Sequence, residues 1–417
     1  MQLLIQNAII RNNSDLKDLT IDEGKIIDIT TAGTKYKPGD FEESIDCEGS
    51  LITESFASPH IHLDKTLIGE HIENVSGTLW EAIQKTWDYK RKYSTEEIFE
   101  RASRIIDDQI KFGTTKFRTH VDVDSIGGLK PLEGLLEVKK RYGDLIDLQI
   151  VAFPQEGILK DEGTKEKMIK ALELGADVLG GMPHNEMTEM DSIEHVKILF
   201  DIAEQFTSPI DAHVDETDDP YSRTLEYVAA ETIRRKFPYS VTADHTCALS
   251  AYNDYHAARV IALVKEANMN MVSNPPTNMV LQGRLDTLAQ RVGTTRIKEL
   301  LVSEVNVTIG QDCIMDPYYP FGKGDMLEVA LLAGHAAKMT LAIEIETLYD
   351  FITTNAFKTM DLRNYELKKG NKADLVILHD VKDVWEAIRL QPPNRTTIRK
   401  GKIISSSSFV HHKRYSI

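Results

Sequence analysis

The segment Ser58-Pro-His-Ile-His62 carries two histidines one residue apart, directly after a largely apolar stretch at residues 51–57. An apolar run of this length is typical of a buried strand. In a strand, side chains two residues apart point to the same side, so His60 and His62 would face one common space. The segment therefore predicts a buried strand that ends in part of a metal site. For this motif taken alone, two hydrogen-bonded core histidines are the alternative.

Further apolar segments follow along the chain, and stretches with helical spacing, such as 164–174 and 222–235, separate them. The segments that we expect to be strands are 115–119, 147–153, 178–182, 210–213, 241–244, 269–273 and 305–309. With the strand before His60 they make eight strand–helix repeats, which close into a (β/α)8 barrel with its sites at the carboxyl ends of the strands. The rival architecture is a doubly wound sheet. It normally carries a glycine-rich phosphate loop after its first strand, and none is present.

The two ends of the chain share a different pattern of short strands and turns. We expect strands at 3–10, 19–21, 25–29, 373–378, 397–399 and 402–404, with turns at Asp22-Glu-Gly24 and Lys400-Gly401. The ends of a chain often lie close together at the surface. The sequence therefore predicts an α/β protein whose TIM barrel spans residues 55–365. A small β-sandwich domain would be formed by residues 1–54 and 366–417.

The composition of the 417 residues is that of an ordinary globular enzyme, with 41% hydrophobic and 27% charged residues. The net charge of −16 argues against a nucleic-acid partner, because phosphate binding needs a basic face. The three cysteines, Cys47, Cys247 and Cys313, imply no disulfide framework. Residues 1–7 lack a signal-peptide pattern, and no run of about 18 apolar residues occurs. We expect a cytoplasmic protein that makes no membrane contact.

Polar candidates follow the predicted strands where the strands end. His60, His62, His213 and Asp312 would form three imidazoles and one carboxylate, a donor set that suits one divalent ion, Zn²⁺ or Fe²⁺. Such an ion lowers the pKa of a bound water toward ~7. For His213 taken alone, a core histidine is the alternative, and for Asp312 a helix N-cap.

Three more candidates would handle protons and substrate. Glu216, three residues after His213, could shuttle a proton, or it could be a solvated loop acid. His245 could orient the attacking hydroxide, or it could be a satisfied core histidine. Gln155 could bind a flat, amide-bearing ring, or it could be a polar loop residue. His120, His184 and Asn274 also fall near strand ends, and we expect supporting or structural roles for them.

These residues resemble the amidohydrolase superfamily and, within it, the bacterial cytosine deaminases. The resemblance runs over almost the whole chain and rests on Pro59-His-Ile-His-Leu-Asp64, Arg118-Thr-His-Val-Asp122, Ala152-Phe-Pro-Gln-Glu-Gly-Ile-Leu159, His213-Val-Asp-Glu216, Leu281-Gln-Gly-Arg284 and Asp312 with Asp316-Pro-Tyr-Tyr-Pro320. It implies a barrel with a small β-sandwich, one divalent metal, a homo-oligomer and hydrolytic deamination of a small heterocycle. It also implies that Glu216 and His245 serve proton transfer and hydroxide orientation, and that Gln155 binds the pyrimidine.

The sequence departs from this family pattern at the predicted substrate edge. Cys313 stands where the family usually has a second acid, and Tyr318 stands where it usually has tryptophan. An uncharged thiol leaves room for a ring substituent, so 5-methylcytosine, isocytosine, creatinine or an aminotriazine are alternatives to cytosine. Another alternative on the same scaffold is a hydrolase that releases an alkylamine from an N-alkyl aminotriazine. A non-catalytic metal-binding protein would be expected to lack Glu216 or a ligand.

Overall fold

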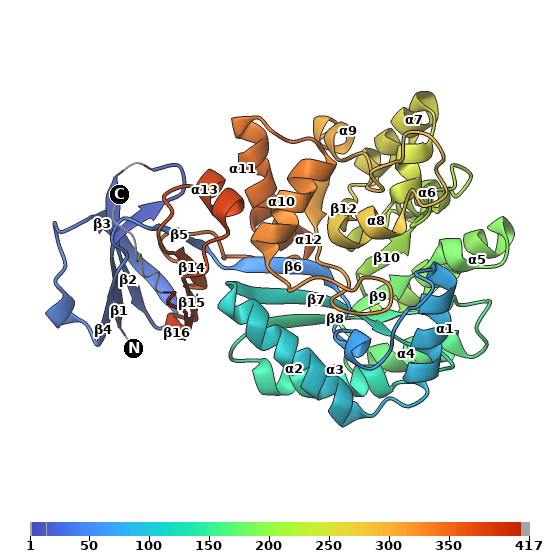
Figure 1. The fold of residues 1–417 in the computed structure, drawn as a ribbon, viewed down its shortest axis with the longest axis horizontal. Coiled ribbons are helices and arrows are strands. Elements are labelled where there is room, and N and C mark those ends of the chain that lie inside the picture. Colours follow the sequence, from blue (N-terminus) through green and yellow to red (C-terminus); the bar gives the residue numbers. More distant parts are fainter. Residues whose placement is uncertain (1, 14, 410–417) are drawn as a thin grey trace.

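Eight parallel strands form the central sheet of the protein, in the order in which they occur along the chain (Figure 1). The structure is a computed structural model, and it describes residues 2–13 and 15–409. The strands are β6 (Phe56–Ile61), β7 (Thr114–Asp122), β8 (Asp147–Phe153), β9 (Val178–Gly181), β10 (Ile210–Val214), β11 (Val241–His245), β12 (Asn270–Ser273) and β13 (Asn306–Ile309). A parallel bridge between Ile61 and Asp312 links the two edges of this sheet. The predicted (β/α)8 barrel is confirmed.

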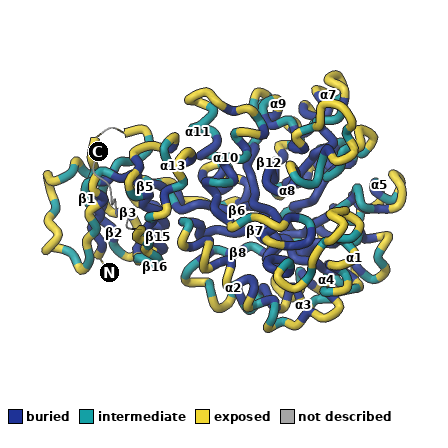
Figure 2. Tube along the Cα trace, viewed as in Figure 1, coloured by how far each residue is buried: buried dark blue, intermediate teal, exposed yellow. Residues whose placement is uncertain are grey.

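Most residues of the barrel strands are buried, as the dark interior of Figure 2 shows. Every residue of β6 and β7 is buried, because one side of each strand faces the barrel interior and the other faces helices. The helices are α1 (Leu79–Lys90), α2 (Thr95–Lys111), α3 (Lys130–Tyr142), α4 (Thr164–Leu174), α5 (Glu189–Phe206), α6 (Thr224–Arg235), α7 (Asp254–Glu266), α8 (Pro275–Leu281), α9 (Ile297–Val302), α10 (Met326–Ala336), α11 (Ala342–Phe351), α12 (Thr354–Thr359) and α13 (Val384–Leu390). Among the described residues, no helix has the length and apolar character needed to cross a membrane.

Strands from both ends of the chain form a second sheet, at the left of Figure 1. They are β1 (Leu3–Ile10), β2 (Leu16–Asp22), β3 (Lys25–Thr31), β4 (Glu43–Asp46), β5 (Leu51–Glu54), β14 (Leu375–Leu378), β15 (Arg395–Arg399) and β16 (Lys402–Ser406). This terminal sheet encloses its own apolar core, to which Leu3, Ile26 and Ile377 belong. The prediction of a small β unit built from both termini is therefore confirmed.

The prediction of one continuous strand over residues 51–57 is wrong. The chain forms β5 up to Glu54 and then leaves the terminal sheet at Ser55. The Ser55 N–H donates to the carbonyl of Asp374, whereas the Phe56 N–H donates to the carbonyl of Gly113 in front of β7. An apolar pattern does not reveal which sheet a residue pairs with, so the change of partner is invisible in the sequence.

Buried ion pairs hold the terminal sheet against the barrel. Arg395 of β15 binds both carboxylate oxygens of Asp325, at 2.9 and 2.8 Å. Arg399, in the same strand, lies 2.7 Å from Asp147 at the start of β8. All three contacts join groups on opposite sides of the joint, so they fix the terminal sheet in one position.

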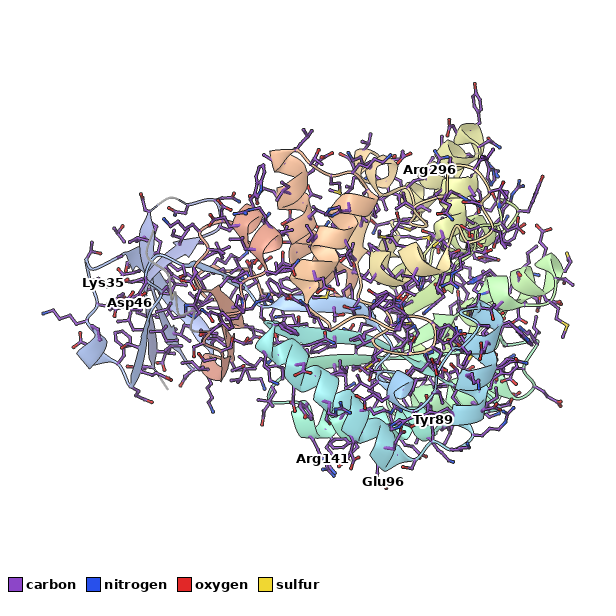
Figure 3. The ribbon with its side chains drawn as sticks, viewed as in Figure 1. Lys35, Asp46, Tyr89, Glu96, Arg141 and Arg296 are labelled. Atoms are coloured by element: carbon purple, nitrogen blue, oxygen red, sulfur yellow. The ribbon has the colours of Figure 1, made fainter. Side chains whose placement is uncertain are left out.

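Charged side chains also lie on the outer surface, among them Lys35, Glu96 and Arg141, which are labelled in Figure 3. Lys35 pairs with Asp28 at 2.6 Å, and Arg141 pairs with Glu137 at 2.6 Å. Glu96, in the acidic first turn of α2, is exposed to solvent.

Candidate active site

Four predicted ligands meet at the carboxyl ends of the barrel strands. His60 lies in β6, His62 directly follows it, His213 lies in β10, and Asp312 follows β13. The Nε2 atoms of His62 and His213 are 3.1 Å apart. Asp312 Oδ1 lies 3.5 Å from Nε2 of His60 and 3.5 Å from Nε2 of His62. Ligands that share a tetrahedral ion at about 2.1 Å lie about 3.4 Å apart, so these three spacings match that expectation, and the ligand atoms of His60, His62 and Asp312 all lie within 4.8 Å of one another.

The hydrogen bonds of the histidines leave their Nε2 atoms available to a metal. His60 Nδ1 lies 2.8 Å from Asp244 Oδ2, and His62 Nδ1 lies 3.1 Å from the carbonyl oxygen of His120. Both Nδ1 atoms therefore carry the proton, and the lone pair is on Nε2. His60 Nε2 is buried and has no hydrogen-bond partner in the described part of the chain. A buried nitrogen without a partner is costly, and a divalent ion would satisfy it.

A row of buried charges supports the ligands from inside the barrel. His120 Nε2 lies 3.1 Å from Asp244 and 3.1 Å from Asp211, and Asp211 also binds Arg118 at 2.5 Å. The supporting role expected for His120 fits this position. The sequence pattern alone did not single out Asp211 or Asp244 as site residues. A usable signal was that Asp211 stands two residues before His213, and so shares its side of the strand.

Glu216 lies beside the ligands and not in the solvent. Its Oε1 atom lies 3.1 Å from His245 Nδ1 and accepts a 3.1 Å hydrogen bond from Asn278 Nδ2. On the other side of the imidazole, His245 Nε2 lies 3.1 Å from Asn274 Nδ2. Polar atoms of Glu216, His245 and Asp312 all lie within 4.8 Å of one another. These three residues therefore surround one small space next to the metal ligands.

Burial sets the protonation states of this group. Burial, together with the nearby Asp312 carboxylate, raises the pKa of Glu216 to about 8. Burial lowers the pKa of His245 to about 3, so its imidazole is neutral at physiological pH. Glu216 can thus hold or release a proton near neutrality, which general acid–base catalysis requires.

Strained backbone marks the ends of two site strands. His245 and Asp312 adopt φ angles of 64° and 61°, which are uncommon for residues other than glycine. Such strain persists only where the surroundings enforce it, and it is concentrated at functional sites. The alternative role of Asp312 as a helix N-cap is not realised, because α10 begins later and is capped by Asp325.

Replacing Gly310 by alanine is expected to displace His60 and to destabilise the protein by about 1–3 kcal/mol, the usual cost of overpacking. An added Cβ would lie 2.4 Å from Asn274 Oδ1 and 2.6 Å from His60 Cβ. The thermal unfolding midpoint and the bound metal should both fall. Gly39→Ala is the matched control, because a Cβ at Gly39 has nothing within 4 Å. Equal midpoints and equal metal contents for the two variants would contradict this account.

The three predicted substrate residues lie around the same end of the barrel. Gln155 follows β8, and its Oε1 accepts a 2.9 Å hydrogen bond from Lys65 Nζ. Cys313 is buried, with its Sγ 3.9 Å from Asp312 Oδ1. Burial and the nearby carboxylates raise the pKa of the Cys313 thiol well above its usual value, so the thiol stays neutral. Tyr318 is half-buried in the loop after Asp312.

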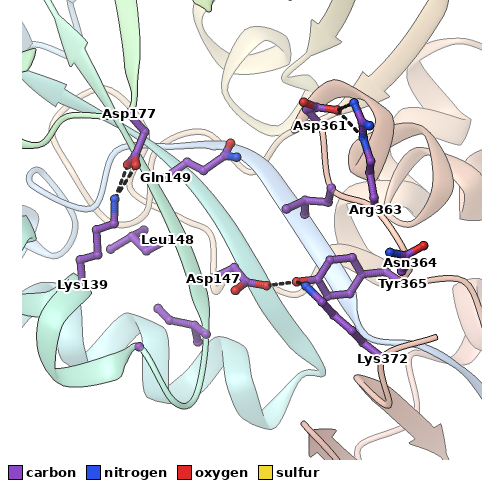
Figure 4. Close-up of a pocket in the computed structure, with 13 residues that line it drawn as sticks. Lys139, Asp147, Leu148, Gln149, Asp177, Asp361, Arg363, Asn364, Tyr365 and Lys372 are labelled. Carbon is purple, nitrogen blue, oxygen red and sulfur yellow. Dashed lines mark hydrogen bonds and ion pairs between the residues drawn. The ribbon is translucent and has the colours of Figure 1, made fainter. Parts of the chain in front are cut away.

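A surface cavity of about 690 Å³ lies at the opposite end of the barrel, by the amino ends of β8 and β9 (Figure 4). Several of its polar groups already have hydrogen-bond or ion-pair partners. Lys139 lies 2.5 Å from Asp177, and the Tyr365 hydroxyl donates to Asp147 at 2.5 Å. Polar groups at this end of a barrel usually serve stability and not chemistry.

Comparisons with known proteins agree with this geometry. A family model described as the amidohydrolase family matches residues 43–405. N-isopropylammelide isopropyl amidohydrolase of Pseudomonas sp. (strain ADP) is 29% identical over 413 residues, which cover 96% of each chain. Pterin deaminase of Rhizobium rhizogenes is 30% identical and covers 94% of this chain and 88% of its own. The solved structure of 5-methylcytosine deaminase from Klebsiella pneumoniae with 5-fluorocytosine is 39% identical. Its TM-score is 0.92, and the match covers 100% of this chain and 99% of that one.

Proposed function

The chain belongs to the amidohydrolase family, and we propose that it hydrolytically deaminates a free base of the cytosine type and releases ammonia. The observation that carries this proposal is the cluster of His60, His62 and Asp312, with His213 3.1 Å from His62 and with Glu216 beside Asp312. The 39% identity to a structure named as a 5-methylcytosine deaminase supports the choice of ring.

The resident metal would be held by the three imidazoles and Asp312. When bound, a divalent cation lowers the pKa of water to about 7 and so supplies a nucleophile at neutral pH. Imidazole and carboxylate donors suit both Zn²⁺ and Fe²⁺. Metal analysis of the purified protein identifies the native ion.

The acidic and neutral side chains beside the ligands would move the protons. Glu216 takes a proton from the attacking water and delivers it to the ring nitrogen beside the amino-bearing carbon. His245 and Asp312 align that water for attack. The new carbon–oxygen bond forms, the carbon–nitrogen bond breaks, and the amino group leaves with the remaining proton. The products are the oxo ring and ammonia.

A cytosine with a substituent at ring position 5 is the substrate that Cys313 favours. This residue stands where relatives are expected to have a second acid near the ring edge. The thiol is smaller than a carboxylate, and the raised pKa of Cys313 keeps it uncharged. A thiol here would therefore leave more space and a less polar surface for a methyl group than a carboxylate would.

Replacing Cys313 by aspartate is expected to lower kcat/KM for 5-methylcytosine relative to cytosine by about tenfold or more. Rejection of one methyl group by a filled pocket corresponds to about 1–3 kcal/mol. Ammonia release from both bases measures the ratio. Cys313→Ser is the matched control, because it keeps the size and adds no charge. A ratio that is the same in both variants would count against contact between Cys313 and the ring.

One substrate panel separates the proposal from its main rival. The metal-loaded protein is incubated with cytosine, 5-methylcytosine and N-isopropylammelide, and ammonia and isopropylamine are assayed separately. The proposal expects ammonia from the two pyrimidines. Isopropylamine from the triazine alone would instead indicate an alkylamine-releasing hydrolase, the activity named for the Pseudomonas relative.

A further inference from the structure

Lys65 is a buried lysine that the mechanism above does not use. It follows the metal-binding segment, and only 2% of its side chain is exposed. Its ammonium lies 2.9 Å from Gln155 Oε1 and 2.6 Å from Asp122 Oδ1. The ammonium is also 5.6 Å from the centre of the Phe153 ring, which stacks on the ligand His213. Lys65 therefore lies between the predicted ring-binding residue and the metal ligands.

We propose that Lys65 is a positioning residue that fixes the orientation of the Gln155 amide, so that the site selects rings with an oxo group opposite this amide. The inference rests on the proposed function and deepens it. An ammonium has three donors and no acceptor, so the amide atom that faces Lys65 must be Oε1. The amide nitrogen then points the other way, where its contact is Met182 Sδ at 3.3 Å. Sulfur is a weak acceptor, and a ring oxygen would replace it readily.

The surroundings of Lys65 hold its ammonium in place. The second oxygen of Asp122 accepts a 2.7 Å hydrogen bond from Lys90, so one buried carboxylate binds two lysines. Lys90 also binds Asp124 and lies 3.7 Å from Glu156, the neighbour of Gln155. Removing the Lys65 charge would leave Asp122 paired with Lys90, so no buried charge would lose its only partner.

A second anchor restrains the loop that carries Gln155. Trp87 of α1 donates a 2.7 Å hydrogen bond to Glu156, and Lys90 belongs to the same helix. The backbone beside Gln155 is therefore held independently of Lys65. Lys65 determines which amide group, the oxygen or the nitrogen, points toward the ring. The two groups are nearly equal in size, but the oxygen accepts hydrogen bonds and the nitrogen donates them.

The proposal predicts a change in substrate preference when Lys65 is replaced. With the amide nitrogen facing the ring, cytosine presents its 2-oxo group as an acceptor. In 2,4-diaminopyrimidine the same position carries an amino group, and donor would face donor. Without Lys65 the amide can turn, and its oxygen can accept from that amino group. A site that places a donor opposite the ring strongly rejects a ring that also presents a donor there. The preference for cytosine should therefore fall when the amide is free to turn.

The test measures kcat/KM for ammonia release from cytosine and 2,4-diaminopyrimidine with the metal-loaded protein. Lys65→Met should lower the cytosine preference at least tenfold, mainly through KM for cytosine. In a Gln155→Ala background the same change should have no effect on the preference. Lys139→Met is the matched control, because it removes a paired lysine at the opposite end of the barrel. An unchanged preference in folded Lys65→Met protein, or a change that persists without Gln155, would overturn the proposal.

Gln155→Glu decides the matter if Lys65→Met does not fold. The carboxylate keeps an acceptor for Lys65 and presents an acceptor to the ring, so the preference should shift toward 2,4-diaminopyrimidine. An unchanged preference would show that no amide N–H faces the ring. If the metal-loaded wild-type protein releases ammonia from neither base nor from 5-methylcytosine, the proposed function itself fails. That outcome is distinct from a failed role of Lys65.

Discussion

Replacement of Glu216 by glutamine should lower kcat for deamination about 10²- to 10⁴-fold, the usual contribution of a general acid–base residue. Glutamine keeps the shape and can still bond to Asn278, which donates to Glu216 at 3.1 Å. It cannot take a proton from water or deliver one to the ring. The raised pKa of Glu216, about 8, fits a group that changes protonation in each turnover near neutral pH.

Steady-state ammonia release, measured beside metal content, tests this role of Glu216. Metal content should be the same in Glu216→Gln and wild-type protein, because Glu216 is not one of the proposed ligands. Asp219→Asn is the matched control, since Asp219 is an exposed acid in the same loop. Full turnover by Glu216→Gln protein with bound metal would exclude it as the proton carrier.

Replacement of His62 by alanine is expected to abolish both metal binding and activity. Changing a group behind a ligand costs 10- to 100-fold in metal affinity, so loss of a direct ligand should cost at least about 100-fold. The Nε2 atom of His62 lies 3.1 Å from Nε2 of His213 and 3.5 Å from Oδ1 of Asp312. Alanine would therefore remove one donor from the proposed ligand set and leave a cavity in its place.

Metal per chain after dialysis and ammonia release are the two measurements for His62. Treatment of the wild-type protein with a chelator should give the same loss, and added Zn²⁺ or Fe²⁺ should restore activity to it but not to the variant. His335→Ala, an exposed histidine of α10, is the control. A His62→Ala protein that keeps its metal would contradict the proposed ligand set.

The barrel could be predicted because its strands are short apolar segments separated by helical spacing, and both patterns reflect local burial. The ligand positions followed, since strand ends meet at one rim. The pairing of β5 with the terminal sheet could not be predicted, because the pattern that reports burial does not report the partner. The buried charges were missed for the same reason. Lys65, Asp122 and Lys90 are far apart in sequence, and only the fold joins them.

Some inferences from the sequence stay predictions. They are the division into residues 1–54 with 366–417 and residues 55–365, the homo-oligomer, the cytoplasmic location and the identity of the metal. The role of every site residue also stays a prediction: the ligands His60, His62, His213 and Asp312, the catalytic Glu216 and His245, and the substrate residues Gln155, Cys313 and Tyr318. Each has a direct measurement. Limited proteolysis reports the division, sedimentation reports the oligomer, and the substrate panels report the ring contacts.

The joint between the terminal sheet and the barrel has a mechanical consequence. Only Ser55 separates β5 from the strand that carries His60, and the pairs of Arg395 with Asp325 and of Arg399 with Asp147 fasten the two units further along the chain. One connecting residue and these ion pairs leave the two units little freedom to rotate, so the joint cannot act as a hinge. We therefore expect the terminal sheet and the barrel to move as one body, and we expect turnover to respond more to substitutions in the loops around the mouth of the barrel than to substitutions at the joint.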